Sequence, residues 1–243
     1  MQVRRIELRR SEVLRRSGRD LSIYFFRLDL PSGVAASNVV GTAPSGKWLE
    51  EFGGDDSEDF FLSMAVWGMG DTNAPCVAQE VHEQLLLDAG VFRPKELVQY
   101  RQPLPDGKFL AGVYLDDLLL LQILPRKDHQ DKLASDHSHR DVDAIHRAES
   151  AYAAAGLEIS HSKSFNMELV FKAWGLEVNG DLGIMATPLS TRVHIFAMLL
   201  LVLRIGEVEK KVMEIILGNL TSALLPRKEL LCLLHRSYKF TSD

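Results

Sequence analysis

Cysteine and long hydrophobic runs are scarce in this sequence, and both shortages narrow the class of protein. The two cysteines, Cys76 and Cys232, lie far apart in 243 residues, which excludes a disulfide scaffold and a zinc-ribbon spacing. The longest apolar run covers nine residues, 195–203, whereas a membrane-spanning helix needs about 20. The arginine-rich beginning of the chain has no apolar core of a secretory signal. We therefore expect an intracellular protein, in the cytoplasm or the nucleus, without a membrane segment.

Acidic residues outnumber basic ones, and the net charge of −5 argues against a nucleic-acid partner when it is summed over the whole chain. The charge is, however, unevenly distributed. Residues 1–20 carry seven arginines against three acids, residues 204–239 carry seven basic residues against four acids, and residues 50–59 carry six carboxylates. Basic ends can bind phosphate backbones, although a pair of solvated helix faces is the simpler interpretation of the same pattern.

Hydrophobic periodicity and turn residues predict a globular α+β protein. Two apolar runs, 109–114 and 118–123, indicate a β-hairpin, and residues 169–178 and 183–185 predict a second one that turns at 179–181. The other expected elements are helices at 6–16, 74–89, 141–155 and from 191 onward with a break at Pro226, a strand at 22–30, and an acidic surface loop or hairpin at 42–59. Residues 197–203 are expected to form helix core.

Two adjacent aspartates, Asp116 and Asp117, interrupt the first predicted hairpin. Burying unpaired carboxylates is costly, and two like charges side by side repel each other. The pair therefore either forms the exposed tip of the hairpin, which is the simpler interpretation, or binds a cation. A divalent ion such as Mg²⁺ would need a further carboxylate. Asp20, at the mouth of the predicted strand 22–30, is the candidate, and a strand-start or capping residue is its simpler interpretation.

The string Tyr114-Leu115-Asp116-Asp117 resembles the Tyr-x-Asp-Asp signature of reverse transcriptases. Further strings resemble other motifs of that family, in the family's order. Asp20 with Phe25 resembles the first palm motif, residues 69–75 with Gln79 the second, residues 156–157 with Lys163 the fourth, and residues 171–176 the primer-grip hairpin. Together these strings cover roughly residues 20–188.

The resemblance implies a palm, an antiparallel sheet backed by helices, at residues 20–188. A helical thumb-like or connection-like segment would follow at 189–243, and a basic N-terminal helix at 1–19 would be a remnant of the fingers. Because only 19 residues precede Asp20, we expect a chain that is truncated at its N-terminus. The implied activity is RNA-directed DNA polymerisation by a retrotransposon-like element. Its partners would be an RNA or DNA template with a primer and deoxynucleoside triphosphates, in an unspecified oligomeric state.

The resemblance also implies roles for single residues. Asp20, Asp116 and Asp117 would hold two Mg²⁺ or Mn²⁺ ions for phosphoryl transfer, and Lys163 would donate a proton to the pyrophosphate. Phe25, Gly70 and Tyr114 would lie against the incoming nucleotide and the primer end, and Gln79, Trp174 and Gly175 would contact the template and primer. Most of these positions also have a structural interpretation: core packing for Phe25, strand packing for Tyr114, a turn for Gly70, and solvated side chains for Gln79 and Lys163.

Some residues depart from the pattern of the family. Met69 stands where the family often has Gln, Asp71 places an acid where phosphates would approach, and the acidic stretch lies between the first two motifs. The missing fingers support a second hypothesis, a catalytically silent retroelement remnant that binds nucleic acid or a partner, and the three retained carboxylates speak against it. A metal-dependent phosphohydrolase that uses the same carboxylates is a third, and it lacks a convincing general base.

Overall fold

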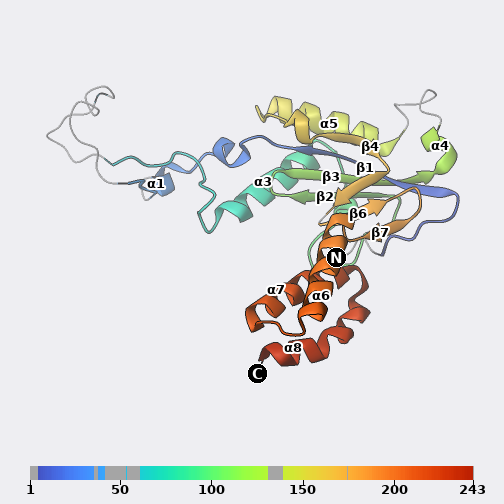
Figure 1. The fold of residues 1–243 in the computed structure, drawn as a ribbon. Helices are drawn as coiled ribbons and strands as arrows, with labels where there is room; N and C mark the ends of the chain where they lie inside the picture. Colours follow the sequence, from blue (N-terminus) through green and yellow to red (C-terminus); the bar gives the residue numbers. More distant parts are fainter. Residues whose placement is uncertain are drawn as a thin grey trace.

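The main sheet has four antiparallel strands in the order β2-β3-β1-β4 (Figure 1). We describe residues 5–35, 38–41, 53, 61–130, 139–173 and 175–242 of a computed structural model of the chain. The strands are β1 (Glu12–Asp20), β2 (Phe109–Tyr114), β3 (Asp117–Pro125) and β4 (Phe165–Glu168). The predicted hairpin is confirmed, because β2 and β3 pair directly and are joined by a tight turn. The expected α+β class, an antiparallel sheet backed by helices, is confirmed as well.

Two long helices cover one face of this sheet: α3 (Ala74–Asp88) and α5 (Arg140–Ala154). Both were expected from the sequence. Pro75 lies in the first turn of α3, where its missing N–H costs no hydrogen bond, and glycines follow both helices. Fully buried alanines from α3, α5 and β2 allow the helices and the sheet to approach closely, and they are Ala74, Ala78, Ala111, Ala144 and Ala148. The main core therefore lies between the helices and the sheet.

A second sheet packs against the opposite face through Phe171 and Val178. Its strands are β5 (Val170–Ala173), β6 (Leu176–Asn179) and β7 (Ile184–Ala186), in that order. The turn at 179–181 is confirmed. Residues 169–178, however, were predicted as one strand and contain two, β5 and most of β6, which pair with each other. At Gly180 a Cβ atom would lie 1.8 Å from the carbonyl oxygen of Leu14, so only glycine allows this turn to approach β1.

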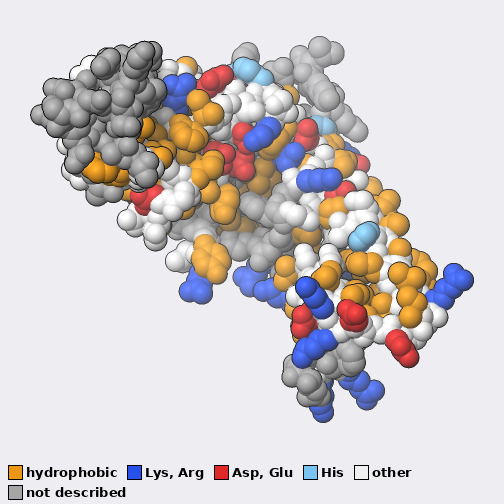
Figure 2. Space-filling model, turned by 60° about the vertical axis from the view of Figure 1, so that its left-hand side comes forward, with side chains coloured by type: hydrophobic (Ala, Val, Ile, Leu, Met, Phe, Trp, Pro, Cys, Tyr) orange, Lys and Arg blue, Asp and Glu red, His pale blue; other side chains and the backbone are white. Residues whose placement is uncertain are grey.

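The C-terminal segment is helical, as expected, and consists of α6 (Leu189–Ile205), α7 (Lys210–Leu224), η5 (Leu225–Leu234) and α8 (His235–Ser242). The expected break lies beside Pro226, where Arg227 leaves helical geometry. The expectation that 197–203 forms helix core is wrong: of the 17 residues of α6, all of them described, only Ile195 is buried. Hydrophobic side chains consequently lie on the surface of these helices (Figure 2). No helix among the described residues is long and apolar enough to cross a membrane.

Two predicted elements are wrong. Residues 6–16, and the proposed basic helix 1–19 as far as it is described, form no long helix, because β1 begins at Glu12 and lies inside the sheet. The reason is that Arg15 and Arg19 are buried and paired with acids on α5, rather than solvated. The predicted strand 22–30 is replaced by a short 3-10 helix, η2 (Tyr24–Arg27), whose Tyr24 and Phe25 side chains enter the core.

The remaining short helices are α1 (Ser32–Ala35), η3 (Pro94–Glu96), α4 (Arg126–Gln130) and η4 (His161–Lys163). The predicted acidic loop at 42–59 lies, apart from Gly53, outside the described residues.

Candidate active site

The pairing of β1 with β3 brings the predicted carboxylates together at one end of the main sheet. Asp20 is the last residue of β1 and lies opposite Asp117, the first residue of β3, in the antiparallel register. The backbone N–H of Leu21 donates to the carbonyl of Asp116 at 3.0 Å, which ties the end of β1 to the turn. Asp20 therefore closes a strand instead of opening one, as the sequence had suggested. Its side chain is nearly buried, at 8% exposure, whereas Asp117 reaches solvent.

The turn between β2 and β3 is held in an unusual conformation from behind. Leu115 has a φ of 54°, in the left-handed region that non-glycine residues rarely adopt. The amide of Gln79 on α3 bonds the turn twice: its Nε2 donates to the carbonyl of Val113 at 2.9 Å, and its Oε1 accepts from the N–H of Leu115 at 2.9 Å. His82, one turn further along α3, lies 2.6 Å from the carbonyl of Leu115. The polar side of α3 thus fixes the backbone that carries Asp116.

Negative charge accumulates at this end of the sheet. Partial burial, the charges of Asp116 and Asp20, and hydrogen bonding to Asp20 raise the pKa of Asp117 to about 6. Lys163 counteracts the charge: its Nζ donates to both carboxylate oxygens of Asp20, at 3.1 and 2.9 Å. These bonds and the charge of Asp20 raise the pKa of Lys163 in turn. The site therefore concentrates three carboxylates around one ammonium group.

The donor set suits a hard divalent cation, because all three side chains offer carboxylate oxygens and repel one another without a counter-ion. Lys163 now supplies part of the positive charge. Within the described part of the chain, no three His, Cys, Asp or Glu side chains are arranged to hold an ion as they stand. Because Lys163 bonds both oxygens of Asp20, binding an ion there requires this ammonium to move away.

The other predicted site residues differ in their placement. Tyr114 lies at the same tip, paired with Asp117 and 65% exposed. Phe25 is packed in the main core at 7% exposure, and Gln79 is engaged with the turn. Gly70 precedes α3 in open space. Gly175 has a φ of 78° between β5 and β6 of the second sheet, and Trp174 lies outside the described residues.

Sequence reasoning missed two residues behind the turn. His82 and Tyr152 are fully buried, and the Nε2 atom of His82 lies 2.8 Å from the hydroxyl of Tyr152. The one available signal was a histidine on the buried face of the predicted helix 74–89, three positions after Gln79. A lone histidine in that position is usually a core residue with satisfied hydrogen bonds, so its connection to the aspartates could not be read from the sequence.

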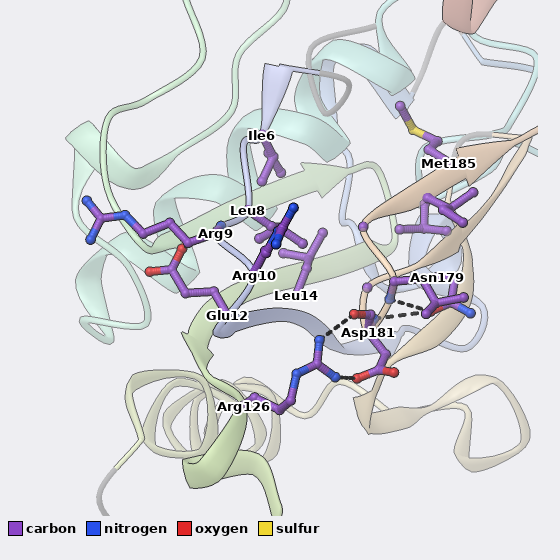
Figure 3. A pocket seen from close by; sticks show the side chains of 15 residues that line it. Ile6, Leu8, Arg9, Arg10, Glu12, Leu14, Arg126, Asn179, Asp181 and Met185 are labelled. Atoms are coloured by element: carbon purple, nitrogen blue, oxygen red, sulfur yellow. Dashed lines mark hydrogen bonds and ion pairs between the residues drawn. The ribbon is translucent and has the colours of Figure 1, made fainter.

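A separate cavity of about 430 Å³ lies at the other end of β1, between residues 6–14 and the turn from β6 to β7. Arg126 and Asp181 on its wall form an ion pair and point toward each other, whereas Arg9 is directed away from them (Figure 3). None of the three carboxylates lines this cavity. It is therefore distinct from the candidate active site.

An antiparallel sheet backed by two helices, with carboxylates at the end of its central strands, defines an α+β fold of the polymerase-palm type. Two solved structures share the fold. A foamy viral protease-reverse transcriptase dRH in complex with ds DNA has a TM-score of 0.56 at 13% identity, with 94% of this chain and 31% of that chain covered. The foamy viral protease-reverse transcriptase in complex with RNA/DNA hybrid has a TM-score of 0.55 at 14% identity, with 94% and 24% covered.

The chain thus spans less than a third of the length of these two proteins. At such low identity the likeness concerns the fold. No protein-family model and no curated protein sequence matches the chain.

Proposed function

We propose that this chain is the RNA-directed DNA polymerase domain of a retrotransposon-like element, which adds deoxynucleotides to the 3′-hydroxyl of a primer. The observation that carries the proposal is the register of β1 and β3, which sets Asp20 opposite Asp117 and beside Asp116 on a palm-type sheet. The reverse-transcriptase-like fold supports it, because the two similar solved structures named above contain nucleic acid. An RNA or DNA template with a primer is therefore the expected partner.

In this proposal, Asp20, Asp116 and Asp117 hold two Mg²⁺ or Mn²⁺ ions. When bound, such ions lower the pKa of a hydroxyl nucleophile and stabilise the charge on the leaving pyrophosphate. The protein's own task is positioning, because phosphoryl transfer depends mainly on alignment and charge stabilisation. Asp117 reaches solvent at the tip, and Asp20 is anchored at the end of a central strand. Lys163, whose side chain is 64% exposed and would leave Asp20 when an ion binds, would give a proton to the pyrophosphate.

The remaining roles concern the substrates. Tyr114 is exposed beside Asp117, where it can contact the primer end and the incoming deoxynucleoside triphosphate. Phe25 would limit the space below the sugar, and Gly70 would let the backbone approach the nucleotide. Gly175 and Trp174 would contact the primer strand. We assign Gln79 a positioning role beside its expected template contact, because its amide already bonds the turn.

Primer extension on an RNA template with Mg²⁺ tests the proposal. Asp116→Asn should reduce incorporation by about a thousandfold, because it removes one negative charge from the set that binds the ions. Asp106→Asn, on an exposed loop before β2, is the matched control and should extend the primer like the wild type. Equal incorporation by the wild type and Asp116→Asn would remove this carboxylate from the mechanism.

The ion pair between Lys163 and Asp20 favours a second candidate, a catalytically silent protein that binds nucleic acid or a partner. In that case Lys163 neutralises Asp20 permanently, and no ion enters. The expected result is salt-dependent binding of a primer–template duplex without nucleotide incorporation. Incorporation that is abolished in Asp116→Asn would exclude this candidate.

A further inference from the structure

His82 connects three elements directly behind the candidate active site. It lies in the middle of α3 and is fully buried. Its Nδ1 atom is 2.6 Å from the carbonyl oxygen of Leu115 in the turn, and its Nε2 atom is 2.8 Å from the hydroxyl of Tyr152 on α5. One imidazole ring thus joins the turn that carries Asp116 to both helices of the main core.

The direction of both hydrogen bonds follows from their chemistry. A carbonyl oxygen only accepts, so the proton on this side of the ring belongs to Nδ1 of His82. Burial lowers the pKa of His82, which keeps the ring neutral and leaves Nε2 as an acceptor. The hydroxyl of Tyr152 therefore donates to Nε2, and Nδ1 donates to Leu115. Each buried polar atom in this chain of bonds has its partner.

The turn needs such a support. Leu115 is a side-chain-bearing residue at a φ of 54°, which costs about 1 kcal/mol or more relative to ordinary backbone. Its N–H is held by Gln79 and its carbonyl by His82, so both adjacent peptide planes are fixed from α3. The next peptide joins Asp116 to Asp117, and its carbonyl, that of Asp116, accepts a hydrogen bond from the N–H of Leu21. The orientation of Asp116 consequently depends on the carbonyl of Leu115.

We propose that His82 and Tyr152 are positioning residues of the active site: the chain of bonds from the Tyr152 hydroxyl through the His82 ring to the Leu115 carbonyl holds the Asp116 turn in its working conformation. This inference rests on the proposed polymerase function and deepens it. Neither residue touches substrate, because both are fully buried. Their effect is on the rate of the chemical step and not on the affinity for the nucleotide.

Tyr152→Phe is the first test, because it removes one hydroxyl and keeps the ring in the core. We expect kcat for primer extension to fall about tenfold with an unchanged KM for the nucleotide, since small misplacements of reacting groups cost rate. Amide hydrogen exchange at residues 115–117 should accelerate. Tyr24→Phe is the matched control, because its buried hydroxyl donates to Ala78 within α3 and not to the turn. It should leave kcat and exchange at the turn unchanged.

A pair of substitutions at His82 separates positioning from mere core packing. The amide nitrogen of His82→Asn can take the place of Nδ1 and donate to Leu115, whereas His82→Leu offers no donor. We expect His82→Asn to retain more of kcat, and more exchange protection at the turn, than His82→Leu, even where both variants lose similar stability. Equal kcat and equal exchange protection in these two variants, or in Tyr152→Phe and the wild type, would overturn the inference.

The exchange measurement also distinguishes this inference from the proposed function. Faster exchange at the turn of Tyr152→Phe, in a protein whose wild type does not extend a primer, would refute the polymerase and keep the structural coupling. An active wild type with an unaltered turn in Tyr152→Phe would keep the polymerase and refute the coupling.

Discussion

The main sheet and the C-terminal helices invert the usual distribution of polar and apolar side chains. At the sheet, Arg15 and Asp141 are buried and paired, with the guanidinium donating to both carboxylate oxygens at 2.8 and 2.7 Å. On α6, Val193 and Phe196 are 58% and 62% exposed, and Leu203 is 78% exposed. Hydrophobicity alone therefore does not decide what is buried in this protein. A charged side chain can enter the interior when an oppositely charged partner meets it there.

The largest effect is expected where a buried charge loses its partner. Asp141→Asn leaves the guanidinium of Arg15 buried without a counter-charge between β1 and α5, and should lower the free energy of unfolding by about 3–5 kcal/mol. Denaturant unfolding measures this change. The double variant Arg15→Met with Asp141→Leu should recover most of the loss, because two apolar groups need no ion pair. A loss below about 1 kcal/mol in Asp141→Asn would show that the pair is not desolvated.

The same pair explains which elements the sequence could predict. The hairpin of β2 and β3 and the helices α3 and α5 follow from local signals: two apolar runs beside a turn, Pro75 in a first turn, and glycines after the helices. Strand β1 does not, because its arginines look solvated until their partners are known. Asp141 lies 126 residues from Arg15, and Glu149 lies 130 residues from Arg19. No local sequence pattern extends over separations of this length along the chain.

The candidate site was predictable to the same extent. Asp116 and Asp117 are conspicuous in an apolar run, and the structure brings Asp20 to them, although at the end of a strand instead of its beginning. His82 and Tyr152, 70 residues apart, meet only in the folded protein. Sequence reasoning thus identifies residues that are locally improbable, and it misses those whose role depends on a distant partner.

Acidification should weaken the support behind the turn. Burial lowers the pKa of His82 from its usual 6.5, so below pH 6.5 the unfolded chain binds a proton that the folded protein excludes. Each pH unit below 6.5 should therefore cost up to about 1.4 kcal/mol of stability until the folded-state pKa is reached. Unfolding free energies of the wild type and His82→Asn between pH 7.5 and 5 measure this contribution. The slope should be flatter in His82→Asn, and parallel slopes would assign the pH dependence to other groups.

Asp117 should act in the opposite direction. Its folded-state pKa of about 6 lies above the usual 3.8, so between these values the folded protein holds more protons, and stability falls as the pH rises. Asp117→Asn should accordingly stabilise the protein at pH 7 by about 1 kcal/mol or less, since the side chain reaches solvent. Thermal unfolding at pH 7 and pH 4 measures the difference, which should vanish at pH 4. Mg²⁺ should raise the Tm of the wild type at pH 7 more than that of Asp117→Asn.

The smallest effect is expected on α6, where the apolar residues are exposed. Phe196→Lys together with Leu203→Lys replaces two exposed side chains and should change the free energy of unfolding by no more than about 0.5 kcal/mol. Ile195→Lys, the neighbouring position in the same helix, is the matched control, because Ile195 is buried and a lysine there would lose its hydration. Its stability should fall by several times that amount.

Comparing Phe196→Lys/Leu203→Lys with Ile195→Lys at two protein concentrations makes the test decisive. The double variant could lose as much stability relative to the wild type as Ile195→Lys does, but only at the higher protein concentration. In that case a second copy of the chain covers the α6 face of the wild type, and association supplies the missing burial. If the loss is large at every concentration, the contrast between the two regions is wrong, and α6 is packed within the chain. If the stability of the double variant equals that of the wild type at both concentrations, the contrast between the two regions is confirmed. The buried charges then need their partners, and the exposed apolar side chains of α6 do not contribute to the stability of the fold.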